Sequence, residues 1–250
     1  MACLRRNWFV LVLAVSTAWS SLAAAQQVAE SPVKAQPASV KPAPRNDKWW
    51  MDRHEKMNQR VKQGNVDMVL IGDSITHGWE GAPEVWNEFF GKRNAVNLGI
   101  GGDQTQHVLW RLENGNLEGI SPKLAVVMIG TNNAGSGQKP EEIVEGVKAV
   151  VETLRRKAPN TTVLVLAIFP RGANTKDHLR QVNTEANAQI AKLADGKKVI
   201  FLDIGPKFLD AEGNLSKEVM PDLLHLTPKS YRIWAETMEP TVAKIMGGKE

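Results

Sequence analysis

Cysteine is almost absent from this sequence: Cys3 is the only one in 250 residues. Because Cys3 lies in an N-terminal stretch that we expect to be removed, the mature chain would contain no thiol. That excludes a disulfide framework, a cysteine-ligated metal and a cysteine nucleophile. The histidines show no metal-ligand spacing either, so we expect no metal. We interpret His54 and His178 as solvated positions on helices.

Nucleotide-binding motifs are also missing. Gly91-Lys92-Arg93 lacks the earlier glycine and the following Ser or Thr of a phosphate-binding loop. Around Gly99, the residue Gln104 stands where a dinucleotide fingerprint needs its third glycine. No basic patch alternates with aromatic residues, as nucleic-acid binding would require. The sequence therefore predicts neither a cofactor nor a nucleic-acid partner.

Charge of one sign is not in excess. Lys and Arg number 31 against 27 Asp and Glu, for a formal net charge of +4, and 42% of the residues are hydrophobic. This ordinary globular composition excludes a wholly disordered chain, a collagen and a coiled-coil rod. A length of 250 residues suits one well-buried α/β domain.

The N-terminus has the pattern of a signal peptide. Two arginines, Arg5 and Arg6, precede an apolar run from Trp8 to Val15, and Ala23-Ala24-Ala25 fits the small-residue rule for cleavage. The apolar run is short for a membrane span. We expect residues 1–25 to be cleaved, leaving no integral membrane span and a secreted or periplasmic protein. The alternative, an uncleaved anchor, is less consistent with the proline-rich stretch that follows.

Residues 26–46 contain four prolines, several alanines and scattered basic residues with no apolar period. Such a composition is typical of a disordered linker. The pattern changes from Trp49 onward, and we expect residues 47–250 to form one domain.

Five short apolar runs in that domain predict buried parallel strands. Helical periods separate them; one helix is expected after Pro140 and the last after the cap Thr227-Pro228. Alternation of strand and helix predicts an α/β fold with helices on both faces of a mostly parallel sheet. The runs are 68–71, 95–98, 124–129, 163–169 and 199–202.

Polar residues follow the first three runs and precede the last helix. Ser74 follows the first run, Gly102 the second and Asn132 the third, while Asp222 and His225 lie just before the last helix. In a parallel sheet these loops meet at one edge, where ligands bind. Taken singly, each signal has an ordinary explanation as a turn, a cap or a structural histidine.

Together these residues can perform nucleophilic catalysis. Serine is a weak nucleophile, so Ser74 needs a neutral imidazole, His225, to accept its proton. Asp222 would orient that imidazole. The backbone N–H groups of Ser74 and Gly102 and the side-chain amide of Asn132 would form an oxyanion hole.

The sequence resembles the SGNH (GDSL) hydrolases. That family has four conserved sequence blocks, which match Ser74, Gly102, Asn132 and His225 in order. The resemblance is closer still to the catalytic subunits of platelet-activating factor acetylhydrolase. It spans roughly residue 47 to the C-terminus and is carried by NLGIGGDQTQHVLWRLENGNLEGISPK (97–123), VVMIGTNN (126–133), FPRG (169–172) and DLLHLTPKSY (222–231).

The resemblance implies a three-layer α/β/α sandwich around a flavodoxin-like, five-stranded parallel sheet. It also implies metal-independent ester hydrolysis through an acyl-enzyme on Ser74. In that subfamily the positions of Ile75, Thr131 and Leu224 restrict the acyl pocket to short chains such as acetyl. The related subunits are intracellular and pair as dimers, so a homodimer is a further expectation.

The sequence thus favours a secreted serine esterase acting on a small acyl ester, acetyl in particular. One alternative is a carbohydrate acetylesterase acting on acetylated polysaccharide. A second is a non-catalytic module of the same fold that binds glycan or envelope, and a remote third is a flavodoxin-like cofactor binder.

Overall fold

Five parallel strands form the centre of the molecule. They are β1 (Met68–Gly72), β2 (Ala95–Gly99), β3 (Leu124–Met128), β4 (Thr162–Leu166) and β5 (Val199–Leu202), in the order β2-β1-β3-β4-β5. This is the flavodoxin-like order with β1 next to β3. β1 and β3 are buried at every position, which explains their continuous apolar sequences. The five predicted strands and the fold class are confirmed.

The structure is a computed structural model that describes residue 2 and residues 35–247. The predicted signal peptide and the first part of the predicted linker lie outside the described residues. No helix in the described part of the chain is long and apolar enough to cross a membrane.

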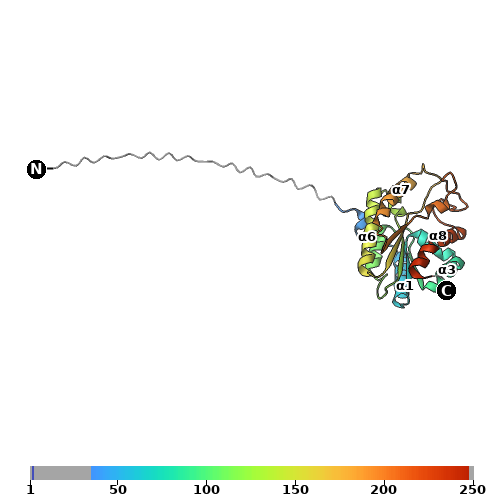
Figure 1. The fold of residues 1–250 in the computed structure, drawn as a ribbon, viewed down its shortest axis with the longest axis horizontal. Coiled ribbons are helices and arrows are strands. Elements are labelled where there is room, and N and C mark those ends of the chain that lie inside the picture. The colour runs from blue at the N-terminus through green and yellow to red at the C-terminus, as the bar shows by residue number, and fades with distance from the viewer. Residues whose placement is uncertain (1, 3–34, 248–250) are drawn as a thin grey trace. The chain divides into compact units, whose positions relative to one another are not determined.

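Helices cover both faces of the sheet, in three layers. One face packs against α1 (Lys48–Lys62), α4 (Thr105–Glu113), α6 (Pro140–Lys157) and α7 (His178–Ile190); the other packs against α3 (Pro83–Phe90) and α8 (Pro228–Met246). Figure 1 shows α6 and α7 apart from α3 and α8, with the strands between them. Alternate residues of a strand serve the two layers: Val69 and Ile71 belong to the first core, Met68 and Leu70 to the second.

Short helices fill the connections between these elements. Two of them, α2 (Ser74–His77) and α5 (Thr131–Gly135), directly follow β1 and β3 and carry predicted site residues. The others are single 3₁₀ turns: η1 (Ala38–Val40), η2 (Gly78–Gly81), η3 (Gly91–Arg93), η4 (Ala191–Leu193) and η5 (Gly205–Phe208).

Residues 36–46, which we call the strap, differ from the prediction of a disordered linker. Ser39 is fully buried, and its carbonyl oxygen accepts a hydrogen bond of 2.9 Å from Thr105 Oγ1. The backbone N–H of Ala43 donates to the carbonyl oxygen of Gln106 at 3.1 Å. Gly146 of α6 permits this approach, since a Cβ there would lie 2.9 Å from that of Ser39. The contacts are largely made through the backbone, so they leave no apolar period in the sequence.

His54 is a second difference. We expected a solvated histidine, but its side chain is buried, stacked on Trp50 at 5.8 Å between ring centroids. Burial lowers the pKa of His54 below its usual value, and the charge of Arg111 lowers it further. His54 lies four residues after the buried Trp50 and seven before the buried Val61, so it belongs to the core-facing side of α1.

Candidate active site

Three predicted residues from distant parts of the chain form a hydrogen-bonded row. His225 Nε2 lies 2.8 Å from Ser74 Oγ, and His225 Nδ1 lies 2.6 Å from Asp222 Oδ2. Ser74 begins α2 at the carboxyl end of β1, while Asp222 and His225 belong to the loop before α8. The hydroxyl, the imidazole and the carboxylate thus have the order needed to pass a proton from oxygen to nitrogen.

Close packing and a helix cap fix the turn that carries Ser74. Gly72 ends β1 where a Cβ would lie 2.2 Å from Thr76 Oγ1 and 2.4 Å from the Met128 carbonyl oxygen, so only glycine fits. Asp73 Oδ1 caps α2 by accepting from the Ile75 N–H at 2.9 Å. The serine therefore lies on a sharp strand-to-helix turn, where the residue is partly exposed.

The carboxylate of Asp222 is held in its ionised form. Burial alone would raise its pKa, but the hydrogen bond from the His225 ring and those from the backbone N–H groups of His225 and Leu224 outweigh it. The pKa of Asp222 falls to about 2. An ionised partner at Nδ1 fixes the tautomer in which Nε2 can accept a proton.

The loop between Asp222 and His225 adopts an unusual backbone conformation. Leu223 has φ +61°, in the left-handed region that a leucine rarely occupies. Its carbonyl oxygen accepts a hydrogen bond of 2.9 Å from the Gly172 N–H. The left-handed turn lets one carboxylate reach both the backbone and the ring of a residue only three positions away.

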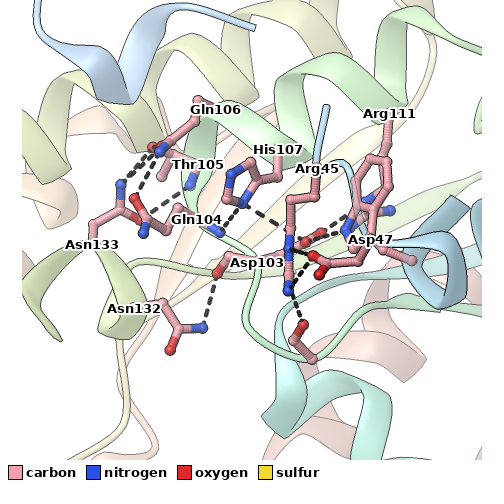
Figure 2. A network of polar contacts seen from close by, with 12 residues as sticks. Arg45, Asp47, Asp103, Gln104, Thr105, Gln106, His107, Arg111, Asn132 and Asn133 are labelled. Atoms are coloured by element: carbon pink, nitrogen blue, oxygen red, sulfur yellow. Dashed lines mark hydrogen bonds and ion pairs between the residues drawn. The ribbon is translucent and has the colours of Figure 1, made fainter. Parts of the chain in front are cut away.

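Each of the three predicted oxyanion donors has an N–H group that is free to donate a hydrogen bond to a substrate. In the described part of the chain, no acceptor pairs with the backbone N–H of Ser74 or of Gly102. Asn132 Nδ2 donates one hydrogen to the Asp103 carbonyl oxygen at 2.9 Å, as Figure 2 shows, and retains a second. This bond ties the third donor to the loop that carries the second.

A buried ion pair supports that loop. Asp103 and Arg111 are both fully buried, and Arg111 Nε donates to Asp103 Oδ2 at 2.8 Å. The other carboxylate oxygen accepts from Trp50 Nε1 at 2.6 Å. Arg111 Nη1 also donates to Asn116 Oδ1 at 2.6 Å. Asp103 therefore holds the loop through these hydrogen bonds and the ion pair.

Asp73 is a second buried carboxyl beside the site. Complete burial raises its pKa to about 7, the nearby Asp103 adds to that shift, and the hydrogen bond from the Ile75 N–H opposes it. Asp73 Oδ2 has no hydrogen-bond partner among the described residues. An unpaired buried oxygen favours the protonated acid.

The three positions of the predicted acyl pocket lie on elements that meet at the site. Ile75 and Thr131 are buried and Leu224 is partly exposed. Thr131 Oγ1 accepts hydrogen bonds from Arg171 at 3.1 Å and from Asn183 at 3.3 Å. A cavity of about 520 Å³ lies elsewhere, along β2, and contains none of them.

Several residues that position the site were not predicted. Arg45, Trp50 and Arg111 hold the Gly101–Asp103 loop. Tyr231 OH donates to the Ile75 carbonyl oxygen at 2.6 Å. An arginine within the apolar stretch HVLWRL was a signal for Arg111, since charged residues are rarely buried unless paired. In the described residues no group of three or more His, Cys, Asp or Glu could hold a metal ion.

A parallel α/β/α sandwich with a serine, a histidine and a carboxylate aligned at its carboxyl edge defines a carboxylic ester hydrolase. The comparisons with known proteins agree: residues 70–233 match the GDSL-like lipase/acylhydrolase family. The chain belongs to this family.

Its relatives include platelet-activating factor acetylhydrolase IB subunits. The human alpha1 subunit is 41% identical over 200 residues, covering 78% of this chain and 84% of the relative. The rat alpha2 subunit is 38% identical over 202 residues, covering 80% and 86%.

Solved structures share the fold. A GDSL-like lipase from Bacteroides thetaiotaomicron superimposes with a TM-score of 0.63 at 21% identity, covering 77% of this chain and 97% of its own. An acetylxylan esterase from Geobacillus stearothermophilus gives a TM-score of 0.56 at 16% identity, covering 74% and 96%.

Proposed function

We propose that this enzyme hydrolyses short-chain carboxylic esters, acetyl esters in particular, through an acyl-enzyme on Ser74. The observation that carries the proposal is the row of 2.8 Å and 2.6 Å contacts that joins Ser74, His225 and Asp222. The preference for acetyl is supported by the names of the relatives, which are acetylhydrolases.

In the first half-reaction, His225 Nε2 accepts the proton of Ser74 while Oγ bonds to the ester carbonyl carbon. The carbonyl oxygen becomes an oxyanion that accepts hydrogen bonds from the N–H groups of Ser74 and Gly102 and from the Asn132 amide. The intermediate then collapses, the C–O bond to the alcohol breaks, and the leaving alcohol takes the proton from His225. An acyl-serine remains.

In the second half-reaction, His225 removes a proton from water, and the resulting oxygen nucleophile attacks the acyl carbon. Collapse of the second oxyanion breaks the bond to Oγ, which regains its proton from His225. A carboxylic acid is released. Asp222 stays ionised and stabilises the imidazolium in both halves.

The test of this mechanism is turnover of p-nitrophenyl acetate by Ser74→Ala. We expect hydrolysis to be abolished with the thermal melt unchanged, and Ser216→Ala, at an exposed serine, to behave as wild type. Labelling by a fluorophosphonate should occur in wild type and be lost in Ser74→Ala. Unchanged turnover would eliminate the mechanism, and a folded wild type that neither turns over esters nor is labelled would favour a non-catalytic binding module.

A second candidate narrows the alcohol half of the substrate to an acetylated polysaccharide. The signal-like pattern of residues 1–25 favours it, because an exported enzyme meets acetylated glycans more readily than an intracellular signalling phospholipid. A panel of acetylated xylo-oligosaccharide, acetylated phospholipid and p-nitrophenyl acetate, butyrate and octanoate separates the candidates. Preference for octanoate would refute the small acyl pocket.

We also propose that the protein acts outside the cytoplasm after cleavage following Ala25. Expression of the full chain with cell fractionation tests this. We expect the protein in the exported fraction with Gln26 as its first residue; a cytoplasmic protein that keeps Met1 would contradict it.

A further inference from the structure

The peptide group between Gly101 and Gly102 carries one of the proposed oxyanion donors. Its N–H belongs to Gly102, which has no hydrogen-bond partner in the described part of the chain. Its carbonyl oxygen belongs to Gly101 and accepts a hydrogen bond of 2.7 Å from Arg45 Nη1. The two ends of this one peptide group therefore face the proposed oxyanion hole and an arginine of the strap.

Fixing one end of a peptide group fixes the other. A trans peptide is planar, with its C=O and N–H pointing in opposite directions. Two successive glycines restrict the backbone little, and Gly102 has φ +79° in the left-handed region. The Asp103 N–H closes this turn on the Ile100 carbonyl oxygen at 3.2 Å, but a turn closed in that way allows two orientations of its central peptide. The guanidinium of Arg45 holds that peptide in one of them. Figure 2 shows this side chain reaching down to the loop beside Asp103.

The contact also affects the strength of the donor. A hydrogen bond from a cation is stronger than one between neutral groups. A carbonyl that accepts such a bond polarises its peptide, so the N–H at the opposite end becomes a better donor. The neighbouring Gly101 N–H donates to His77 Nδ1 at 3.3 Å, which holds the preceding peptide as well.

Arg45 is itself fixed on two further sides. Its Nε and Nη2 lie 3.0 Å and 2.9 Å from Asp47 Oδ2. Its guanidinium carbon lies 5.1 Å from the centroid of the Trp49 ring. The strap that carries it is anchored at Ser39 and Ala43. The arginine is thus held in place before any substrate binds.

We propose that Arg45 is a positioning residue for ester hydrolysis: it orients and polarises the Gly101–Gly102 peptide so that the Gly102 N–H meets the oxyanion. The inference rests on the proposed function. The strap would then contribute to catalysis even though it precedes the first strand, because Arg45 acts through the peptide group that it holds.

The experiment compares Arg45→Gln and Arg45→Lys with wild type, using p-nitrophenyl acetate. We expect Arg45→Gln to lower kcat by about 10–100-fold with KM within about twofold, less than the roughly 10²–10³-fold loss on deleting an oxyanion donor. Arg45→Lys, which keeps a charged donor, should recover part of the rate. Inhibition by methaneboronic acid, whose serine adduct mimics the tetrahedral intermediate, should weaken by a factor similar to the fall in kcat.

Arg60→Gln is the matched control, because Arg60 also donates to a backbone carbonyl, that of Gly64 at 2.9 Å, but at the far end of α1. It should leave kcat and boronate inhibition unchanged. A folded Arg45→Gln with wild-type kcat and inhibition would overturn the inference. If Arg45→Gln does not fold, Arg45→Lys decides, and wild-type kcat together with wild-type inhibition would overturn it. An active Ser74→Ala, by contrast, would overturn the proposed function itself.

Discussion

The hydroxyl of Tyr231 donates a hydrogen bond of 2.6 Å to the carbonyl oxygen of Ile75, the residue directly after the proposed nucleophile. The contact joins α8 to α2 across 156 positions of sequence. A Cβ on Gly78 would lie 2.1 Å from the same hydroxyl, so the tyrosine fits closely beneath the turn. The catalytic turn is therefore supported from the core side as well as from the sheet.

Tyr231→Phe tests this support. It leaves a buried carbonyl oxygen without its partner, which should lower the free energy of unfolding by about 1–3 kcal/mol. Urea unfolding monitored by tryptophan fluorescence measures the loss. Lys229→Ala, at an exposed position of α8, should change it by less than about 0.5 kcal/mol. Equal stability of Tyr231→Phe and wild type would show that the bond contributes nothing.

Asn132→Ala tests the third oxyanion donor. We expect kcat for p-nitrophenyl acetate to fall by roughly 10²–10³-fold with little change in KM, because the amide stabilises charge that develops only in the transition state. Steady-state kinetics on a variant with an unchanged melting temperature give both parameters. A change confined to KM would reassign Asn132 to substrate binding.

Arg111→Met tests the buried ion pair beneath the oxyanion loop. Removing one partner leaves the Asp103 carboxylate buried without its counter-charge, which should cost about 3–5 kcal/mol of stability. The double variant Arg111→Met with Asp103→Leu removes both charges and should be more stable than the single one. Urea unfolding of the two variants provides the comparison, and a loss below about 1 kcal/mol in the single variant would argue against a structural ion pair.

Asp73→Asn tests the raised pKa of the buried carboxyl. The pKa of Asp73 is about 7 in the folded protein against a usual value of 3.8. As the pH rises between these values, the unfolded chain loses this proton while the folded chain keeps it, so Asp73 makes stability fall with rising pH. The opposite shift of Asp222, to about 2, acts only at lower pH.

The measurement is the urea midpoint of wild type and Asp73→Asn at pH 5 and pH 8. Wild type should lose more stability than the variant between the two values, whatever the cost of the substitution itself. Parallel pH dependence of the two proteins would place the pKa of Asp73 in the ordinary range.

The sheet could be predicted from the sequence because β1 and β3 are buried on both faces. Burial on both faces requires apolar residues at every position, and these appear in the sequence as unbroken apolar runs. It also located Ser74, Asn132 and His225, because parallel strands bring the loops after them to one edge. The strap was predicted wrongly for a physical reason: the contacts of Ser39, Ala43 and Arg45 run to or from backbone atoms. Because every residue has these backbone atoms, such contacts require no particular residue type at the other end, and the sequence gives no sign of them.

Leu223 sets a limit on how this loop can vary. A left-handed backbone at that position suits glycine or asparagine and strongly disfavours β-branched side chains. The spacing of the carboxylate and the imidazole is therefore only half of the motif; the other half is the handedness of one residue between them. If the sequence Asp-Leu-Leu-His were transferred to a loop of another protein, it would supply the carboxylate and the imidazole. The two side chains would be oriented as they are here only if the residue after the aspartate also had a left-handed backbone conformation.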